Sequence, residues 1–315
     1  MGNVEIKRIK LLEFSYLSHF SFSQLRIFIF ILFFLSSCEK DITIHLKDSQ
    51  AQLVVEATIE NGKPPIVFLS SSLDYFSQIT TEILAQSFVH NAKVIVSDSS
   101  TSVQLKEYAT PVDTSGNLVY YYTVDSLNST NFTGSLNHSY SLRIEVNSKV
   151  YNSQTTIPPL AKKIDSIWWK QAPDNPDTNK IVVEAKVTDP PGLGNYIRYF
   201  TSENDGPFFP GLNSVFDDQI VDGTTYNVDV DKGVNRNEKI DLNNYAFFER
   251  GDSVIVKFCN IDKATYDFWR TMEYNYQSIG NPFSTPTTVI SNISNNALGY
   301  FGGYAAQYVS LRIPK

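Results

Sequence analysis

Short apolar stretches alternate with polar positions along most of the chain, and this alternation predicts β-strands. Between residues 42 and 157 the stretches are rich in Val, Ile, Tyr and Thr and recur about every ten residues, with Ser, Asn, Asp or Gly between them. They are ITIHL (42–46), QLVVEATI (52–59), PIVFLS (65–70), AKVIVSD (92–98), SVQLKEY (102–108), LVYYYTV (118–124), SYSLRIEV (139–146) and VYNSQTTI (150–157). Regular short strands without helical periods favour an antiparallel sandwich. The pattern therefore predicts an immunoglobulin-like or transthyretin-like β-sandwich domain over residues 38–157.

The segment IPPLAKK interrupts this pattern at residues 157–163. Pro158 and Pro159 cannot donate to a strand ladder, so the sequence predicts an inter-domain linker over residues 158–163. A second β-rich domain is then expected over residues 164–315. Its predicted strands are IDSIWWK (164–170), KIVVEAKVTD (180–189), YIRYFTS (196–202), TTYNVDV (224–230), SVIVKF (253–258) and YVSLRI (308–313).

One segment of the second half has a helical period instead. In residues 262–279 the apolar positions Ala264, Phe268 and Met272 fall four apart. Asp262 can cap the first turn, and Gly280 follows the last one. The sequence therefore predicts one amphipathic helix over about 262–279, with its aromatic side chains packed on a sheet.

The N-terminal residues predict an export signal. Residues 27–35 form an unbroken apolar run after Arg26, and a membrane-spanning helix would need about 20 such residues. The run fits a secretory signal over residues 1–37, and Leu35-Ser36-Ser37-Cys38 has the form of a bacterial lipobox. Acyl chains such as palmitate on Cys38 would hold the mature protein on a membrane.

Composition limits the possible partners. The chain has 315 residues and a net charge of −7, with 42% hydrophobic residues and no dense Lys/Arg stretch. We therefore do not expect nucleic acid to be a partner of this protein. Once Cys38 is modified, Cys259 is the one remaining thiol. It lies in an alternating stretch, so we expect it to be buried in a strand.

The search for catalytic motifs is negative. The sequence has no G-x-S-x-G elbow, H-E-x-x-H helix, P-loop or G-x-G-x-x-G fingerprint, so no catalytic residue is predicted. A surface hydrolase with an unidentified pair of carboxylates stays an alternative.

Calcium is the cofactor that the sequence leaves open. In NVDVDKGVNRNE (227–238) oxygen-bearing side chains stand at positions 1, 3, 5 and 12 of an EF-hand-like register. Lys232, however, stands where the sharp turn needs Gly, and the alternation with Val is also typical of a half-exposed strand. FDDQIVDG (216–223) is interpreted as a capped turn. The candidate calcium ligands are Asn227, Asp229, Asp231 and Glu238.

GYFGGYA (299–305) is the candidate binding segment. Glycines allow the backbone to turn tightly or to approach a neighbour closely. Tyr300, Phe301 and Tyr304, if exposed beside such a turn, could stack on sugars or anchor a protein partner. The alternative is a glycine-bent strand with its aromatic side chains in the core.

Several segments together resemble the Bacteroidota outer-membrane lipoproteins known as domain of unknown function 4249. The resemblance spans the mature chain and includes CEKDI (38–42), TIPPLAKKIDSIWW (156–169), DPPGLGNYIRYF (189–200), VFDDQIVDGTTYNV (215–228), GDSVIVKFCNIDKATYDFWRTME (251–273) and GNPFSTPTTVISNISNNALGYFGGYA (280–305). The family is often encoded beside TonB-dependent receptors, and no activity is defined for it. The resemblance implies a lipid-anchored outer-membrane protein, and the charges after Cys38 resemble a surface-export signal.

We therefore expect an accessory or binding component associated with a TonB-dependent transporter. A surface hydrolase acting on glycan or peptide, and a structural or adhesive surface module, are the alternatives. A carboxylate cluster in a deep pocket would favour the hydrolase, and an aromatic patch would favour the binding protein.

Overall fold

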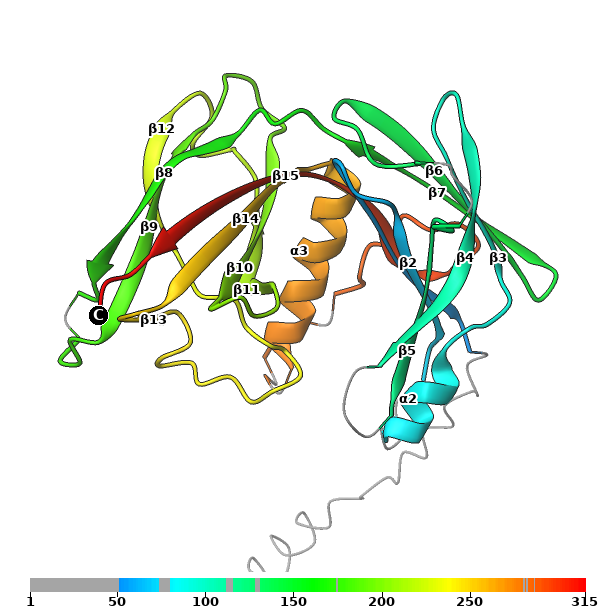
Figure 1. Ribbon diagram of the computed structural model, residues 1–315, viewed down its shortest axis with the longest axis horizontal. Coiled ribbons are helices and arrows are strands. Elements are labelled where there is room, and N and C mark those ends of the chain that lie inside the picture. The colour runs from blue at the N-terminus through cyan, green and yellow to red at the C-terminus, as the bar shows by residue number, and fades with distance from the viewer. Residues whose placement is uncertain are drawn as a thin grey trace, which may run out of the picture. The chain divides into compact units, whose positions relative to one another are not determined.

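β-Strands are the main secondary structure of the described residues, as the alternation predicts (Figure 1). A computed structural model describes residues 51–73, 80–111, 116–127, 131–173, 175–279, 281, 283–285 and 287–315. The predicted signal 1–37, Cys38 and the strand expected at 42–46 lie outside the described residues. Within the described ranges the mainly β class is confirmed.

The larger sheet has 11 strands in the order β11-β10-β14-β15-β1-β2-β5-β4-β3-β6-β7. They are β1 (Leu53–Glu60), β2 (Ile66–Ser71), β3 (Lys93–Ser97), β4 (Ser102–Pro111), β5 (Leu118–Thr123), β6 (His138–Val146), β7 (Lys149–Ile157), β10 (Tyr196–Glu203), β11 (Phe209–Phe216), β14 (Ser253–Ile261) and β15 (Leu298–Arg312). β4 pairs with β3 through residues 102–105 and with β5 through residues 106–111, so it joins two layers. The immunoglobulin-like assignment of the first half stays a prediction.

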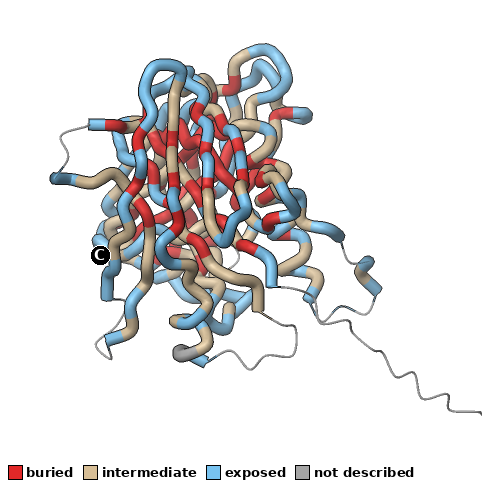
Figure 2. Tube along the Cα trace, turned by 90° about the vertical axis from the view of Figure 1, so that its right-hand side faces the viewer, coloured by how far each residue is buried: buried red, intermediate tan, exposed pale blue. Residues whose placement is uncertain are grey.

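The smaller sheet has four strands and covers one face of the second half. It consists of β12 (Thr225–Val230), β9 (Lys180–Thr188) and β13 (Phe248–Glu249), with β8 (Lys163–Gln171) paired to β9. Val183 and Val187 of β9 belong to the same hydrophobic cluster as Val254 and Val256 of β14. Buried and exposed residues alternate along the strands in Figure 2, because successive side chains point to opposite faces.

β15 joins strands from the two halves of the sequence. It pairs in parallel with β1 on one side and antiparallel with β14 on the other. Gly299 has a φ of +97°, and a Cβ there would lie 1.8 Å from the Val55 carbonyl oxygen. A Cβ on Gly303 would lie 2.5 Å from the carbonyl oxygen of Thr156. Glycine at these two positions therefore lets β15 approach its neighbours closely.

The predicted linker 158–163 packs against β14. The Lys162 backbone N–H donates to Asn260 Oδ1 at 2.9 Å, and Asn260 Nδ2 donates back to the Lys162 carbonyl at 2.8 Å. Residues Gln50–Lys315 form one compact unit. The division into domains at residues 157 and 164 stays a prediction, since the halves share β15.

Two helices accompany the sheets in the described part of the chain. α3 (Lys263–Ser278) confirms the predicted helix, and Asp262 caps it by accepting from the Thr265 N–H at 2.9 Å. α3 packs against β15, β11 and β10 (Figure 1). The second helix, the short α2 (Thr81–Ser87), was not predicted. Neither helix is long and apolar enough to cross a membrane.

Cys259 lies in β14 and is buried, as predicted. Burial raises the pKa of its thiol to about 12. Because the thiolate is the reactive form, this cysteine is a core residue rather than a nucleophile.

Candidate functional site

The candidate site is a cavity of about 480 Å³ on the α3 side of the large sheet. We call it the Arg198 pocket. β10 contributes Arg198 and Phe200, and the alternate residues Ile197 and Tyr199 point to the other face of the sheet. β1 and β15 contribute neighbouring residues because their register pairs Glu56 with Tyr300. The pocket is lined by Glu56, Thr58, Glu60, Arg198, Phe200, Phe208, Phe209, Pro210, Val234, Asn235, Arg236, Asn237, Lys257, Trp269, Tyr300 and Tyr304.

Arg198 is the central cation of this pocket and is only 3% exposed. Its Nε donates to Ser214 Oγ and its Nη1 donates to Tyr304 Oη, each at 3.1 Å. The guanidinium lies 3.4 Å from the ring centroid of Trp269 and 4.7 Å from that of Phe200. In the described chain no carboxylate lies within 4.0 Å of it. A buried charge without a direct counter-ion costs folding free energy, so Arg198 stands out as a functional candidate.

The other charged groups around the pocket leave an excess of positive charge. Arg236 Nη2 pairs with Glu273 at 2.8 Å. Glu60 is shared by Lys257, at 2.5 Å, and Lys63, at 2.8 Å. Glu60 and Glu273 are therefore occupied by these three cations. The local excess is notable because the chain as a whole is acidic.

Hydrogen-bond donors are also in excess in the pocket wall. The indole Nε1 of Trp269 and the Nε of Arg236 are buried and have no acceptor among the described residues. A buried donor without an acceptor loses the free energy of a hydrogen bond to water. Because these two atoms are fully buried, a ligand in the cavity would not reach them, and it is the cations that make the wall suited to a ligand with acceptor oxygens.

Glu56 is the remaining carboxylate of the pocket. Its side chain is open to the cavity, but the surrounding protein displaces bulk water from it. Burial raises the pKa of Glu56 above 4.5, and the charge of Arg198 opposes this rise without cancelling it. A protonated Glu56 would not repel an anion and could donate a hydrogen bond to it.

Replacing Glu56 with Gln should therefore change the pH dependence of stability. Because the folded-state pKa is raised, the stabilisation linked to Glu56 is fully present below the unfolded-state pKa and is lost as the pH rises through the folded-state pKa. Thermal unfolding between pH 4 and pH 8 should show the wild type losing stability relative to Glu56→Gln as the pH rises. The exposed Glu238→Gln variant is the control, and parallel curves for wild type and Glu56→Gln would contradict the raised pKa.

None of the predicted aromatic residues of the GYFGGYA segment is exposed at the surface. Tyr300, Phe301 and Tyr304 are 2%, 0% and 3% exposed. Tyr300 and Tyr304 line the Arg198 pocket, with their hydroxyl oxygens 3.2 Å apart. Phe301 points to the opposite face and belongs to the hydrophobic core of the first half. A ligand in the pocket could reach the two tyrosines but not Phe301.

The residues of the calcium prediction are not gathered around one point. Asn227 and Asp229 lie on the extended strand β12, and Asp229 Oδ1 accepts from Lys170 Nζ at 2.8 Å. Glu238 Oε1 accepts from the side chain of Asn235 at 2.7 Å. Burial raises the pKa of Asp231, and the neighbouring charge of Asp229 adds to the rise. An EF-hand loop curls its ligands around the ion, whereas a paired strand keeps the chain extended.

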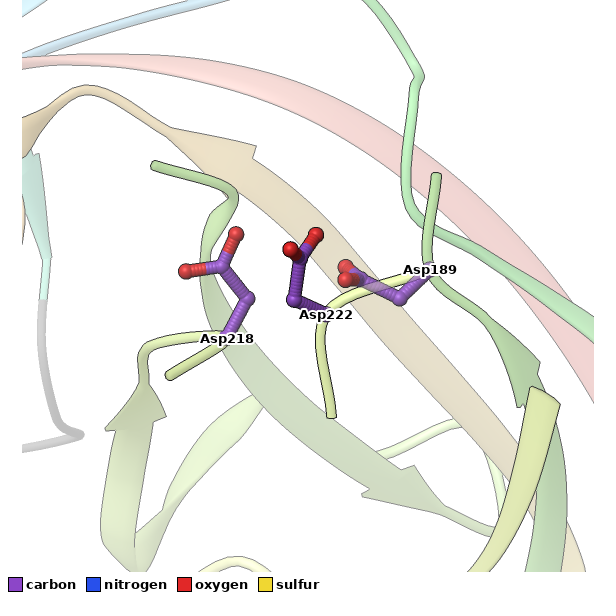
Figure 3. A group of neighbouring side chains, drawn as sticks. All are labelled: Asp189, Asp218 and Asp222. Atoms are coloured by element: carbon purple, nitrogen blue, oxygen red, sulfur yellow. The ribbon is translucent and has the colours of Figure 1, made fainter. Parts of the chain in front are cut away.

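Sequence reasoning did not foresee a different group of carboxylates, Asp189, Asp218 and Asp222, shown in Figure 3. Their oxygens lie within 4.8 Å of one another. Asp218 and Asp222 accept from backbone N–H groups of the loop 192–195 at 2.7–3.1 Å. Asp189 Oδ1 makes no hydrogen bond of good geometry, but Lys162 Nζ lies 3.2 Å away and supplies the counter-charge. These contacts describe a clamp between two loops, in keeping with the capped turn expected at residues 216–223.

Comparison with known families gives one match. The family model described as "Domain of unknown function (DUF4249)" matches residues 39–308, which include every residue of the Arg198 pocket. The chain belongs to this family. No curated protein matches this DUF4249 chain. Two of the segments that carry the resemblance, residues 189–200 and 215–228, are those that the aspartate clamp holds together.

Proposed function

We propose that this DUF4249 protein is a lipid-anchored outer-membrane binding component that works beside a TonB-dependent transporter and takes its ligand in the Arg198 pocket. The lipobox at Cys38 and the family resemblance support the location. The observation that carries the binding role is Arg198 itself, a buried guanidinium close to the rings of Trp269 and Phe200 and without a direct carboxylate partner among the described residues. In this proposal the first half keeps its expected role as a sandwich scaffold.

The chemistry of the pocket favours a small anionic ligand with an apolar or ring-shaped body. A carboxylate, sulfate or phosphate group would supply the counter-charge that Arg198 lacks and would accept from its spare N–H groups. The faces of Phe200 and Trp269 offer apolar contact to the rest of the molecule. Acidic sugars and aromatic acids share this chemistry. The cavity volume lies within the range usual for small-molecule sites.

A hydrolase is the second candidate because Glu56 has a raised pKa and Glu60 has a lowered one. Two carboxyl groups with opposite shifts are a common acid and base pair. Lys257, Lys63 and Tyr308 lower the pKa of Glu60, although burial of the carboxyl group acts in the opposite direction. The two positions are four residues apart on β1, so their Cα atoms lie about 13 Å apart along the strand. The Lys contacts also occupy Glu60, so binding is the better-supported role. An adhesive module has no specific support.

The anchor is tested by replacing Cys38 with Ala. Without the thiol there is no acyl attachment, so the protein should appear as an uncleaved precursor or in the soluble periplasmic fraction. Fractionation of cells expressing wild type and Cys38→Ala, followed by mass measurement of the mature N-terminus, checks this. A processed Cys38→Ala protein that still sediments with the outer membrane would refute the lipobox interpretation. Cys259→Ala is the matched control and should behave as the wild type.

The partner is tested by purifying the wild-type lipoprotein from detergent-solubilised outer membranes. Retention of a TonB-dependent receptor, identified by mass spectrometry, is the expected result. Purification of the wild type without such a receptor, under detergents that preserve other outer-membrane complexes, would count against the association but not against ligand binding in the pocket.

A further inference from the structure

The other face of β10 borders a second cavity, of about 800 Å³. We call it the inter-sheet pocket, because it lies between β9 and β12 of the small sheet and β10 and β14 of the large one. Ile197 and Tyr199 of β10 face it, whereas the alternate residues Arg198 and Phe200 face the Arg198 pocket. The large sheet therefore separates the two cavities, and a ligand in one has no contact with the other.

The wall of the inter-sheet pocket is apolar and well packed at its base. Val187, Val256 and Phe258 line it and are at most 6% exposed. At the mouth the packing is incomplete. Val228 points between the sheets with its neighbours Tyr226 and Val230, yet it is 41% exposed. An apolar side chain that faces the interior of a sandwich but keeps this exposure has space in front of it.

Phe216 and Ile220 are two further exposed apolar residues of this pocket. They are 46% and 96% exposed and both line the pocket. Apolar surface that is concave and open to solvent is a feature of ligand sites more than of ordinary surface.

One polar group points to a ligand. Tyr199 is only 8% exposed, it lines the pocket, and its hydroxyl makes no hydrogen bond with any described residue. A Cβ on Gly211 would lie 2.0 Å from this hydroxyl oxygen, so glycine there leaves the space that the phenol occupies. Burial and the nearby carboxylate of Asp231 raise the pKa of Tyr199, which keeps the hydroxyl protonated. Among the described residues it is a donor without an acceptor, and because it is not one of the fully buried unpartnered atoms it stays accessible to a ligand.

The charges at the mouth restrict the ligand further. Asp217, Asp229 and Asp231 line the pocket against one cation, Arg270. Two groups outside the pocket lining contact these carboxylates. Lys170 forms an ion pair with Asp229, and the Tyr266 hydroxyl donates a hydrogen bond to Asp217. An anionic ligand would meet an excess of carboxylates here, the opposite of the Arg198 pocket.

We propose that the inter-sheet pocket is a second binding site, for an uncharged, mainly apolar small molecule whose single acceptor group meets the Tyr199 hydroxyl. The apolar walls bind the body of the molecule, Tyr199 fixes its polar end, and the acidic mouth excludes anions. This site goes beyond the proposed function and does not depend on it.

The probe for this site is 6-propionyl-2-(dimethylamino)naphthalene, an uncharged fluorophore with one carbonyl acceptor. Titration of the full mature protein should give saturable binding at one site, with the blue-shifted emission of an apolar environment. The Tyr199→Phe variant removes the donor without changing the packing. It should weaken binding about three- to tenfold, the usual effect of one neutral hydrogen bond. The emission should also shift further to the blue, because the carbonyl loses its hydrogen bond.

Two further variants locate the probe. Val228→Trp places an indole in the open mouth and should weaken binding at least about tenfold, whereas Tyr196→Phe on the same strand removes a hydroxyl outside the pocket and should have no effect. Equal thermal unfolding of the three variants and the wild type establishes that each is folded. Undiminished binding by a folded Val228→Trp, or no saturable binding by the wild type, would overturn the site. Dimerisation in sedimentation experiments that excludes the probe would also overturn it and would make the mouth a contact between copies.

Discussion

Replacing Arg198 with Met is expected to remove most of the affinity for anionic ligands while leaving the protein folded. Loss of one partner of a buried, hydrogen-bonded charge pair costs about 2–5 kcal/mol in binding, which corresponds to a factor of about 30 or more. Stability should change little by comparison. The lost contacts with Trp269 and Tyr304 are offset because a buried guanidinium no longer has to be desolvated.

Matched pairs of small molecules measure this effect. Glucuronate is compared with glucose, and phenylacetate with phenylacetamide, by calorimetric titration of the wild type and Arg198→Met. The anionic member of at least one pair should bind the wild type, and Arg198→Met should lose that binding and not distinguish the members of the pair. Arg312→Met, at an exposed position of β15, is the control for the loss of one positive charge. Equal anion affinity in wild type and Arg198→Met would contradict the role of Arg198.

Replacing Lys162 with Met should destabilise the protein strongly without touching the Arg198 pocket, which Lys162 does not line. The side chains of Lys162 and Asp189 are 1% and 0% exposed, with Nζ and Oδ1 3.2 Å apart. Removing the ammonium leaves a buried carboxylate without its cation, and such a change costs about 3–5 kcal/mol. The effect should be visible as a lower midpoint in urea with an unchanged slope.

The double variant Lys162→Met/Asp189→Asn separates the charge effect from packing. It removes both charges but keeps a side-chain oxygen at position 189. In the wild type the Gly223 N–H donates to Asp189 Oδ2 at 3.3 Å, and the Asn oxygen can accept the same hydrogen bond. Most of the lost stability should therefore return. If the double variant is as unstable as Lys162→Met alone, the loss comes from packing of the Lys162 side chain and not from the unpaired carboxylate.

The strands and α3 could be predicted because their signals are local. Period-two alternation marks the predicted strands, and α3 has a cap at Asp262 together with a helical period. β11 and β13 were not predicted, and only residues 308–313 of β15 were predicted as a strand. α2 was missed because seven residues give too few turns for a reliable period. Its cap is Thr80, whose side chain accepts from the Ile83 N–H, but Ser, Thr and Asn are too common in loops for a single cap to signal a helix.

The candidate site could not be predicted in the same way because its residues come from distant parts of the chain. The parallel pairing of β1 with β15 places Glu56 opposite Tyr300, and no local pattern specifies a partner more than 240 positions away. Arg198 carried a weak signal, as a single cation in the alternating stretch YIRYF. The sequence identified Tyr300 and Tyr304 as candidates, but only the structure shows that they line a pocket and that Phe301 does not.

Bromide soaking of crystals of the protein tests the central claim most directly, because it needs no knowledge of the natural ligand. In the part of the chain that the structure describes, the guanidinium of Arg198 has no direct carboxylate partner, and it lines a cavity, so it should attract a small anion. We expect an anomalous bromide peak in contact with Arg198 in wild-type crystals and none at that position in Arg198→Met. Wild-type crystals with bromide bound at other cations but none in the Arg198 pocket would contradict an anion-binding role for this site.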